Sequence, residues 1–540
     1  MDTRAGTAGI VAVTALALAW LASGLPADAF FSGDSGVKLI AALDTIAHPT
    51  RPFETDLPRI GARATTFTDP MVVPHGGHAH VLQSPLFPPL SAPLIAAFGL
   101  RAAYLWPALA FLALVPLLAA ARRHLVPDAS WPVLAWIVVA ANPLLLYALE
   151  FWEHVPAVAL LAAGTAVVAP AFVRDLPAAR MAASGALVGA GILLRPEGAW
   201  YAAGLALALG PRRWLLFGSG AAALLLPAGV LNYLHFGTPL GAHAAAVLAP
   251  IGSAVFLATR WQRVLDWLWP ASAADAIGLA LVAAAWVAVL FKLDVRARQV
   301  LALAGTAVIT VLAARRALPM QSFWQGFPLA LLALMPASAW TPAARRLTWA
   351  ALVAVAGVVL TATNDGGAQW GTRFLLIAAP PLLLLAARGA TDAAGAGAWR
   401  LPRLALVVII LLAGAATSRT AYLELRGTKR NYEGLVAATH AFTRPGDVIL
   451  TNLWWFDQVN GALHGTRTFL YVADRAAAAR ALAMIRAEHL DAVTLAWSAD
   501  GAESPFPLDA ALDGTCFRTT AIREAEPRSI RIAAARCAAE

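Results

Sequence analysis

Apolar runs near the length of a membrane-crossing helix recur along most of this 540-residue chain, and short basic pairs separate them. A helix needs about 20 apolar residues to cross the hydrocarbon core of a bilayer. The composition agrees, because 60% of the residues are hydrophobic and only 13% are charged, against roughly 25% charged in a soluble domain. The sequence therefore predicts an α-helical, polytopic membrane protein.

Hydropathy windows predict about thirteen crossings. They lie at residues 7–25, 102–121, 131–149, 155–173, 181–194, 198–210, 214–231, 272–292, 299–313, 327–340, 347–362, 373–387 and 403–417. Arginine and lysine concentrate in every second loop, as the positive-inside rule expects of cytoplasmic loops when the N-terminus is also cytoplasmic. We therefore expect a multi-pass protein of the bacterial inner membrane whose C-terminal tail, after an odd number of crossings, is periplasmic.

The N-terminal apolar run has a second interpretation. The tripeptide ADA at residues 27–29 follows this run and is typical of a site where a secretory signal is cleaved. Cleavage would remove one crossing, and the segment after it would lie outside the membrane in either case.

Two segments lack the composition of membrane spans. Within the predicted transmembrane domain, residues 1–417, a first outer loop at 26–88 is rich in Pro, Gly, His and acidic residues. Residues 418–540 combine strand-like stretches (DVILT, TFLYV, DAVTLAW) with an amphipathic helical stretch, DRAAAARALAMIRAEH. The tail is therefore predicted to be a small extracytoplasmic α/β domain.

Both cysteines of the chain, Cys516 and Cys537, lie in this tail. A hairpin that turns at Glu526 and Pro527 would place them opposite each other, close enough for a disulfide in an oxidising periplasm. Two unpaired structural cysteines are the alternative. Two cysteines are in any case too few for a metal framework.

The net charge of +9 does not indicate a nucleic-acid partner, because the basic residues occur in short pairs between apolar runs and not in one stripe. The sequence also contains no Gly-x-Gly-x-x-Gly turn and no Walker-type loop. We therefore expect neither a nucleic-acid partner nor a nucleotide cofactor.

Asp34 follows the first span by a few residues, between Gly33 and Gly36, at the expected membrane surface. A partly desolvated carboxylate at this position is suited to act as a general base, and the two glycines permit close approach of backbone and substrate. A helix N-cap is the alternative role. Lys38 lies four residues later, on the same helical face, as either an ion-pair partner or a phosphate contact.

Five motifs, in this order, resemble bacterial glycosyltransferases of the GT-C fold, the relatives of protein O-mannosyltransferases and lipid A aminoarabinose transferases. They are GDSGVK (33–38), SPLFPPLSAPL (84–94), EFWEHVPA (150–157), LRPEGAW (194–200) and GGAQWGTRFLL (366–376). The resemblance implies an enzyme that transfers a hexosyl or pentosyl group, with inversion, from a polyprenyl-phosphate carrier to an acceptor at the outer face.

The resemblance also implies an acidic base in the first outer loop, and we assign Asp34, with Asp56 of the sequence Glu-Thr-Asp as the reserve. The departing carrier phosphate needs cations or donors where its charge develops. Arg373 is the first candidate because a guanidinium holds phosphate with two hydrogen bonds; an interfacial arginine that pairs with Asp365 or snorkels is the alternative. Further phosphate candidates are Lys38, His80, His154 and Arg195.

A second polar group, made of Glu153, His154, Arg195 and Glu197, is predicted at outer helix junctions. Ionisable groups at this depth pair with one another or line a water-filled cavity. We expect them to shape the acceptor pocket, and pairing of Arg195 with a glutamate is favoured over direct catalysis.

The motif HGGHAH contains His75, His78 and His80, whose spacing can hold a metal that Asp69 would complete. The two glycines favour a flexible loop instead. We therefore assign no metal.

Two other functions are compatible with the sequence, a lipid-linked glycan ligase or polymerase and a transporter or flippase. A ligase or polymerase would use diphosphate-linked donors and carry a large catalytic loop late in the chain, whereas the first outer loop is the longest early loop here. A transporter would place ionisable residues at span centres, which are nearly free of charge in this chain. The expected partners are a polyprenyl-phosphate-linked sugar, membrane lipids and an unknown acceptor that is a protein, a lipid or a glycan.

Overall fold

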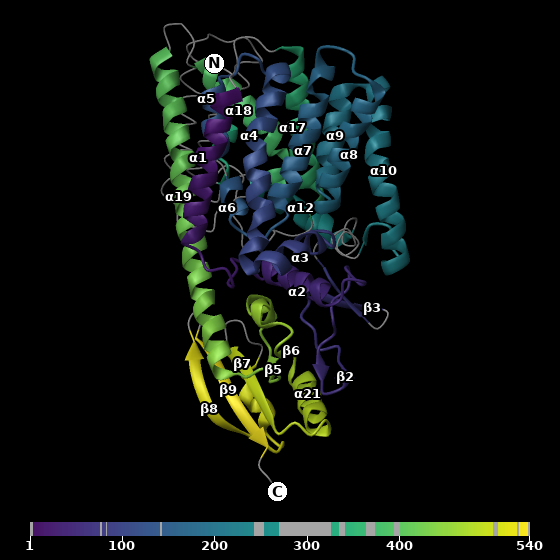
Figure 1. Ribbon diagram of the computed structural model, residues 1–540, viewed down its shortest axis with the longest axis vertical. Coiled ribbons are helices and arrows are strands. Elements are labelled where there is room, and N and C mark those ends of the chain that lie inside the picture. The colour runs from purple at the N-terminus through teal and green to yellow at the C-terminus, as the bar shows by residue number, and fades with distance from the viewer. Residues whose placement is uncertain are drawn as a thin grey trace. The chain divides into compact units, whose positions relative to one another are not determined.

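The computed structural model describes residues 4–75, 78–82, 84–140, 143–241, 253–268, 326–333, 341–362, 373–393, 400–499, 506–525 and 529–537. The chain folds into two compact units (Figure 1). Unit 1 comprises Met1–Trp20 and Trp106–Glu424, and unit 2 comprises Leu21–Leu105 and Leu425–Glu540. This division differs from the predicted one, because the first outer loop belongs to the unit that contains the C-terminal domain.

Unit 1 is built from helices. Its described elements are α1 (Arg4–Ser23), α4 (Leu105–Leu125), α5 (Trp131–Ala140), α6 (Leu144–Ala148), α7 (His154–Val168), η2 (Ala169–Phe172), α8 (Ala178–Leu194), α9 (Gly198–Leu209), α10 (Pro211–Phe236), α12 (Ala254–Leu268), α16 (Ala330–Ala333), α17 (Pro342–Thr361), η3 (Arg373–Ala378), α18 (Ala379–Ala393) and the first half of α19 (Arg400–Phe442) (Figure 1).

Seven helical stretches among the described residues are long and apolar enough to cross a membrane, and four shorter helices are also apolar. The seven are Ala5–Ser23, Leu100–Leu125, His154–Phe172, Pro211–Phe236, Pro342–Thr361, Arg373–Ala393 and Val407–Phe442. They confirm the predicted helical, polytopic architecture. The spans predicted at 272–292 and 299–313 lie outside the described residues, and the span at 327–340 is described only as far as Ala333.

Glycines let neighbouring helices of unit 1 approach closely, as is usual in membrane proteins. A Cβ added to Gly185 of α8 would overlap the backbone of Phe217 in α10, and one added to Gly220 of α10 would overlap the backbone of Ala182 in α8. The sequence pattern of small residues thus fixes the packing of this helix pair.

Helix α19 continues far beyond the predicted end of its span at residue 417. The mean hydropathy falls after that position, but the residues that follow are good helix formers and the first proline comes only at Pro445. Loss of apolar character therefore marks the end of the apolar segment and not the end of the helix. The lower part of α19, from Leu425 on, belongs to unit 2.

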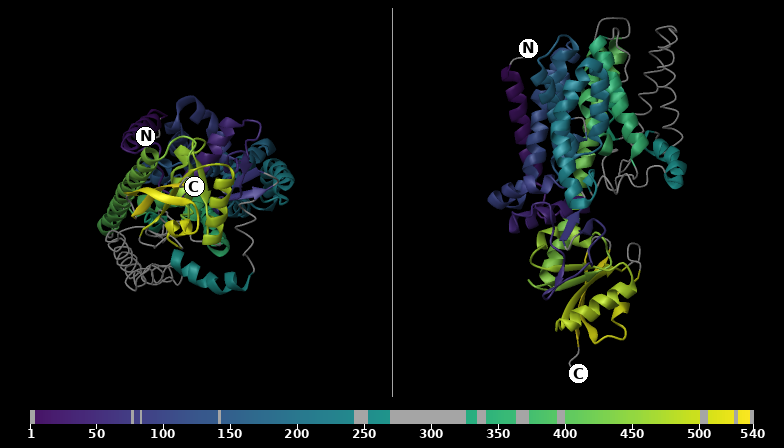
Figure 2. Two further views of the ribbon diagram at one scale, coloured as in Figure 1. Left: turned by 90° about the horizontal axis from the view of Figure 1, so that it is seen from below. Right: turned by 90° about the vertical axis from the view of Figure 1, so that its right-hand side faces the viewer.

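Unit 2 contains a five-stranded sheet in the order β6-β5-β7-β9-β8 (Figures 1 and 2). The strands are β5 (Val448–Thr451), β6 (Thr468–Tyr471), β7 (Ala492–Ser498), β8 (Phe517–Ala525) and β9 (Ile530–Cys537). Strand β5 is parallel to β6 and β7, whereas β7, β9 and β8 are antiparallel. Helix α21 (Arg475–Ala487) begins after Asp474, whose side chain caps it by accepting from the Ala477 amide. The predicted α/β tail is confirmed.

The first outer loop supplies the remaining elements of unit 2. These are α2 (Gly33–Ala47), β1 (Arg59–Ile60), β2 (Arg63–Ala64), β3 (Val72–His75), β4 (His78–Val81), α3 (Phe87–Phe98) and η1 (Leu100–Tyr104). The C-terminal segment adds the short helices α20 (Phe456–Val459), η4 (Gly461–Leu463) and η5 (Leu508–Leu512).

The loop joins the sheet because its apolar residues complete the sheet's core. Alternate residues of β5 face opposite sides, so that Leu450 packs with α21 and Ile449 packs with α19 and α20. Ile60 of the loop is fully buried in the α21-side core. The Tyr471 amide at the end of β6 also donates to the Phe67 carbonyl at 2.9 Å.

Cys516 and Cys537 are joined by a disulfide in the structure, with their Cα atoms 4.7 Å apart. The register differs from the one we expected, since Phe517 and not Cys516 pairs with Cys537, and a bulge follows between Thr519 and Ala521. The two expected turn residues lie outside the described part of the chain.

The glycines beside Asp34 have a packing role. A Cβ added to Gly36 would overlap the backbone carbonyl of Gln458 in α20, and a Cβ on Gly33 would overlap only the side-chain end of Gln458. The close approach that we expected of a substrate is therefore made by α20, which packs against the first two turns of α2.

Replacing Gly36 by Ala is expected to destabilise unit 2 by about 1–3 kcal/mol, because overpacking against a backbone atom forces the two helices apart. Hydrogen–deuterium exchange of α2 and α20 in the purified chain measures this opening. Gly434→Ala is the matched control, since nothing lies within 4 Å of a Cβ at that helical position and alanine favours helix. Unchanged exchange of α2 in Gly36→Ala would show that the contact is not needed.

Candidate functional site

Asp34 lies in the first turn of α2 and is not its cap. The helix begins at Gly33 after Ser32, which takes the N-cap position with an extended backbone, φ −142° and ψ 160°. A carboxylate in the first turn is favoured by the helix dipole. The Asp34 residue is partly buried, and Lys38, one turn further along, is only 1% exposed. Folding therefore fixes both groups on one rigid helix.

Asp56, the reserve base, belongs to an exposed ion-pair group. Its Oδ2 lies 2.9 Å from His48 Nε2 and its Oδ1 lies 3.5 Å from Arg51 Nη2, and the side chain is 47% exposed. This carboxylate is thus already paired with two cationic or hydrogen-bonding side chains at the surface. The geometry leaves Asp34 as the first candidate.

Asp44, near the end of α2, bonds to the C-terminal segment. Its Oδ1 lies 3.0 Å from Nε2 of His464, and its Oδ2 accepts from the Asp56 amide at 3.2 Å. The Asp44 side chain is 8% exposed and the His464 side chain is 22% exposed. This contact fixes the C-terminal half of α2, as Gln458 fixes its N-terminal half.

A pair of neighbouring carboxyl groups, the buried Asp69 and the half-buried Asp457, lies in the same unit. Asp69 is 2% exposed; its Oδ1 accepts from the Met71 amide at 2.6 Å and from Gln458 Nε2 at 3.0 Å. The carboxyl groups of Asp69 and Asp457 are near enough for the charge of one to disfavour ionisation of the other. Burial raises the pKa of Asp69. Burial, followed by the charge of Asp69, raises the pKa of Asp457 well above its ordinary value.

These groups line one cavity of unit 2 with a volume of about 500 Å³. Asp44, Asp56, Asp69 and Asp457 contribute carboxyl groups, and threonines and an apolar wall that includes Phe469 complete the lining. Small-molecule sites occupy roughly 300–1,000 Å³ and combine apolar walls with a few polar groups. The cavity therefore has the size and chemistry to hold a polar group such as part of a sugar.

The carboxyl pair makes the stability of unit 2 depend on pH. Because both folded-state pKa values lie above the ordinary 3.8, the folded state binds more protons than the unfolded state just above that pH. Stability is therefore greatest below pH 3.8 as far as this pair is concerned, and it falls as the pH rises through the raised values.

We expect Asp457→Asn to raise the unfolding temperature of unit 2 at pH 7 and to flatten its dependence on pH, because the neutral amide removes the second charge. Thermal unfolding of the purified chain between pH 4 and pH 8 measures both effects. Asp513→Asn, at an exposed position of the same unit, is the control and should change neither. A lower unfolding temperature for Asp457→Asn at pH 7 contradicts the inferred repulsion between the two carboxylates.

Unit 1 brings Glu153, Arg195 and Glu197 together as a buried ionic group. Arg195 follows the end of α8, and its Nη1 and Nη2 donate to Glu153 Oε1 at 3.0 Å and Glu197 Oε1 at 2.7 Å. The Arg195 side chain is 8% exposed and that of Glu153 is 1% exposed. One guanidinium thus joins the starts of α7 and α9, and the predicted ion pair involves both glutamates.

Aromatic rings surround this ionic group. The Arg195 guanidinium lies 5.3 Å from the Phe374 ring, and the Arg373 guanidinium lies 5.7 Å from the ring of Trp152 and 5.4 Å from Phe374. The ring of His154, a residue that is 3% exposed, is tilted against that of Trp152 at a centroid distance of 5.5 Å. Arg373 therefore lies close to both rings, whereas Arg195 is near Phe374 and His154 is near Trp152. Asp365, the expected partner of Arg373, lies outside the described residues.

The histidine motif forms the hairpin of β3 and β4. His80 is 5% exposed and its Nδ1 lies 2.9 Å from the Phe53 carbonyl, which requires a protonated Nδ1. His78 Nδ1 lies 3.2 Å from Glu54 Oε2. Across the described ranges, no group of three or more His, Cys, Asp or Glu side chains is arranged to hold a metal ion. His80 therefore serves here as a hydrogen-bonding residue of the hairpin.

Three residues of the unit 2 cavity region were missed from the sequence: Asp457, Gln458 and His464. The stretch LWWFDQV (453–459) contained a signal, because an adjacent acid and amide within an apolar segment indicate buried polar groups with partners. Those partners lie almost 400 residues away in the chain, so no local pattern identifies them.

Solved structures with the same fold include ArnT from Cupriavidus metallidurans in the apo state. It is 14% identical with a TM-score of 0.55, and the match covers 98% of both chains. ArnT bound to undecaprenyl phosphate matches at 14% identity and a TM-score of 0.53 over 99% of this chain and 98% of that one. The chain has the GT-C fold.

The archaeal oligosaccharyltransferase AglB from Archaeoglobus fulgidus, in complex with an inhibitory peptide and a dolichol-phosphate, shares this GT-C fold. It is 12% identical with a TM-score of 0.51, and the match covers 98% of this chain and 74% of AglB. No protein-family model and no curated protein sequence matches the chain. The GT-C resemblance expected from the five motifs is therefore confirmed at the level of fold.

Proposed function

We propose that this chain is an integral membrane glycosyltransferase, which transfers a hexosyl or pentosyl group from a polyprenyl-phosphate carrier to an acceptor at the outer face. The observation that carries the proposal is the fold match to ArnT over 98% of both chains. Two of the neighbours are complexes with lipid phosphates, undecaprenyl phosphate for ArnT and dolichol-phosphate for AglB. These ligands support a carrier of the same chemical class here.

In the proposed reaction Asp34 accepts the proton of an acceptor hydroxyl while the hydroxyl oxygen bonds to the anomeric carbon of the sugar. The bond from that carbon to the carrier phosphate oxygen breaks on the opposite side, so the configuration inverts and the carrier leaves as a phosphate anion. Positioning supports this role, because α2 is held at one end by Gln458 and at the other by His464.

We propose that Arg373 of unit 1 binds the carrier phosphate, and Lys38 of unit 2 is a second, separate candidate for a phosphate contact. The rings of Trp152 and Phe374 hold the Arg373 guanidinium in place, which lowers the ordering cost of binding an anion. Arg195 already donates to two carboxylates, so its proposed role is to hold Glu153 and Glu197, with His154, in the wall of the acceptor pocket.

We propose the inner membrane as the location, with the C-terminal domain on the periplasmic side. The disulfide between Cys516 and Cys537 supports an oxidising compartment for that domain. The concentration of arginine in alternate loops supports the same orientation.

The test is to incubate the purified chain in detergent with a panel of polyprenyl-phosphate sugars and to measure the release of free carrier phosphate. Release with at least one sugar, and its increase on addition of a lipid, glycan or peptide acceptor, is the expected result. Release only from diphosphate-linked donors would indicate a ligase or polymerase. Movement of the lipid across liposomes without release would indicate a flippase.

A further inference from the structure

Helices α9 and α17 of unit 1 form a tightly packed antiparallel pair. A Cβ added to Gly204 of α9 would lie 2.5 Å from the backbone of Ala350 in α17, and one added to Gly357 would overlap the ring of Trp200. The Trp200 Nε1 also donates to Thr361 Oγ1 at 3.0 Å. These contacts fix the spacing and register of the two helices.

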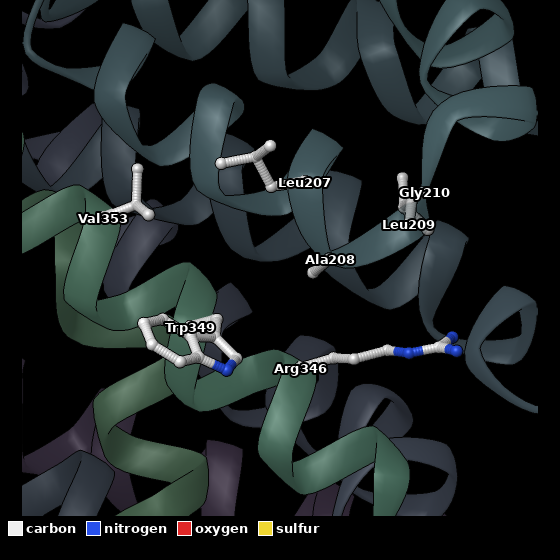
Figure 3. Close-up of a pocket in the computed structure, with 7 residues that line it drawn as sticks. All are labelled: Leu207, Ala208, Leu209, Gly210, Arg346, Trp349 and Val353. Carbon is white, nitrogen blue, oxygen red and sulfur yellow. The ribbon is translucent and has the colours of Figure 1, made fainter.

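Towards the end of α9 this pair borders a groove of about 350 Å³ (Figure 3). Leu207 of α9 lies opposite Val353 and Trp349 of α17, and Arg346 lies one turn before Trp349. The Arg346 side chain extends alongside the end of α9 near Gly210 (Figure 3). The groove thus has apolar walls and a cation at one end, and rigid helices hold both.

The side chains of the groove are exposed on helices that are apolar enough to lie in a membrane. Leu207 and Trp349 are each 65% exposed, and α17 is one of the seven candidate spans. In a bilayer, lipid covers such surfaces, and tryptophan favours the level of the headgroups. A lipid acyl chain therefore fits the apolar part of the groove.

The cation at the end of the groove selects for an anion. Arg346 is exposed, and among the described residues its side chain makes no hydrogen bond or ion pair, whereas Arg213 at the start of α10 donates to Asp175 at 2.6 Å. A guanidinium binds phosphate with paired hydrogen bonds. Basic pockets between spans on the cytoplasmic side are typical sites for anionic headgroups, and we expect the loops that hold Arg213 and Arg346 on that side.

We propose that the groove between α9 and α17 binds an anionic membrane phospholipid, with its phosphate on Arg346 and an acyl chain between Leu207, Trp349 and Val353. This site is separate from the residues assigned to sugar transfer and does not depend on that function. Its occupant is a structural or regulatory lipid, which would stabilise unit 1 by binding the folded state alone.

The experiment compares the whole chain, purified in detergent, with added phosphatidylglycerol or phosphatidylcholine of the same acyl composition. Native mass spectrometry counts bound lipid and a thermal unfolding assay measures the stabilisation. We expect binding of phosphatidylglycerol in preference to phosphatidylcholine, and about a tenfold weaker affinity in Arg346→Gln, the change expected when one charged hydrogen-bonding group is lost.

Arg345→Gln is the matched control, because Arg345 is also exposed in the same turn of α17 but does not line the groove. Trp349→Ala tests the contact with the acyl chain. This change should weaken the binding of phosphatidylglycerol and should not increase the binding of phosphatidylcholine. Equal binding by Arg346→Gln and the unchanged chain, or equal losses in Arg345→Gln and Arg346→Gln, would overturn the proposal. Displacement of the lipid by inorganic phosphate alone would overturn it as well, since the site would then hold a free anion. Unfolding temperatures without added lipid show that each variant is folded.

Discussion

Asp34→Asn is expected to lower the rate of sugar transfer by about 10²- to 10⁴-fold, the contribution typical of a positioned general base. Asparagine has nearly the same shape and cannot accept the proton of the acceptor hydroxyl. Gly33 and Gly36 pack against Gln458, and asparagine keeps the volume of aspartate in the first turn of α2, so the variant should fold. Release of carrier phosphate and formation of the glycosylated product under single-turnover conditions measure the effect, and hydrogen exchange of α2 checks folding.

Asp56→Asn is the matched control for this prediction. Its carboxylate lies in the same loop but is 47% exposed and pairs with His48 and Arg51, so its loss should change the rate by less than about threefold, in line with the small energies of exposed pairs. The opposite pattern, normal turnover in Asp34→Asn and a large loss in Asp56→Asn, would move the base to the Glu-Thr-Asp sequence. Normal turnover in both variants would mean that neither is the base.

Arg195→Met is expected to destabilise unit 1 by about 3–5 kcal/mol, because removal of one member of a buried ionic group leaves carboxylate charge without its cation. Glu153 is 1% exposed and Glu197 is 19% exposed at the side chain, and both accept hydrogen bonds from this guanidinium. Methionine keeps most of the apolar volume against Phe374, which separates the loss of charge from the loss of packing. Thermal unfolding in detergent measures the change.

Arg213→Met provides the comparison on the surface of the same unit. Arg213 pairs with Asp175, whose side chain is 94% exposed, so its removal should cost no more than about 1 kcal/mol. The triple change Arg195→Met, Glu153→Gln, Glu197→Gln should recover much of the stability lost in Arg195→Met, because no carboxylate then remains to be compensated. Equal unfolding temperatures for Arg195→Met and Arg213→Met would show that the Arg195 group is hydrated and not buried.

Local sequence patterns predicted many of the helices and strands, because each pattern depends only on residues that are neighbours in the sequence. Long apolar runs predicted the helices of unit 1, the short strand-like stretches DVILT, TFLYV and DAVTLAW predicted β5, β6 and β7, and the amphipathic stretch DRAAAARALAMIRAEH predicted α21. The last span was predicted to end at residue 417, whereas α19 continues to Phe442. Hydropathy reports where apolar character stops and not where backbone hydrogen bonding stops. The expected hairpin register at Cys516 was also wrong, because the pairing is already shifted beside the turn, where Ala525 pairs with Ile530, and the bulge between Thr519 and Ala521 offsets only part of this shift.

The candidate site depended much more on distant contacts. The sequence did not assign the first outer loop to the unit of the C-terminal sheet, because Ile60 of the loop is buried in a core whose other members come from residues beyond 440. Likewise the purpose of Gly36 is visible only once Gln458 lies against it. The pairing of Asp69 with Asp457 and of Asp44 with His464 depends on the same long-range closure.

The sequence by itself determined that this chain is a helical membrane protein with an α/β tail, and its ordered motifs determined the resemblance to the GT-C fold. Hydropathy and the composition of short strand-like stretches are local properties, so a single sequence contains them in full. Only the tertiary structure decided that α2, which bears Asp34, is fixed by the C-terminal segment, and that Arg195 holds two glutamates at once. Such contacts arise when burial brings together groups from far apart in the chain, and burial of polar groups is stable only where each finds its partner.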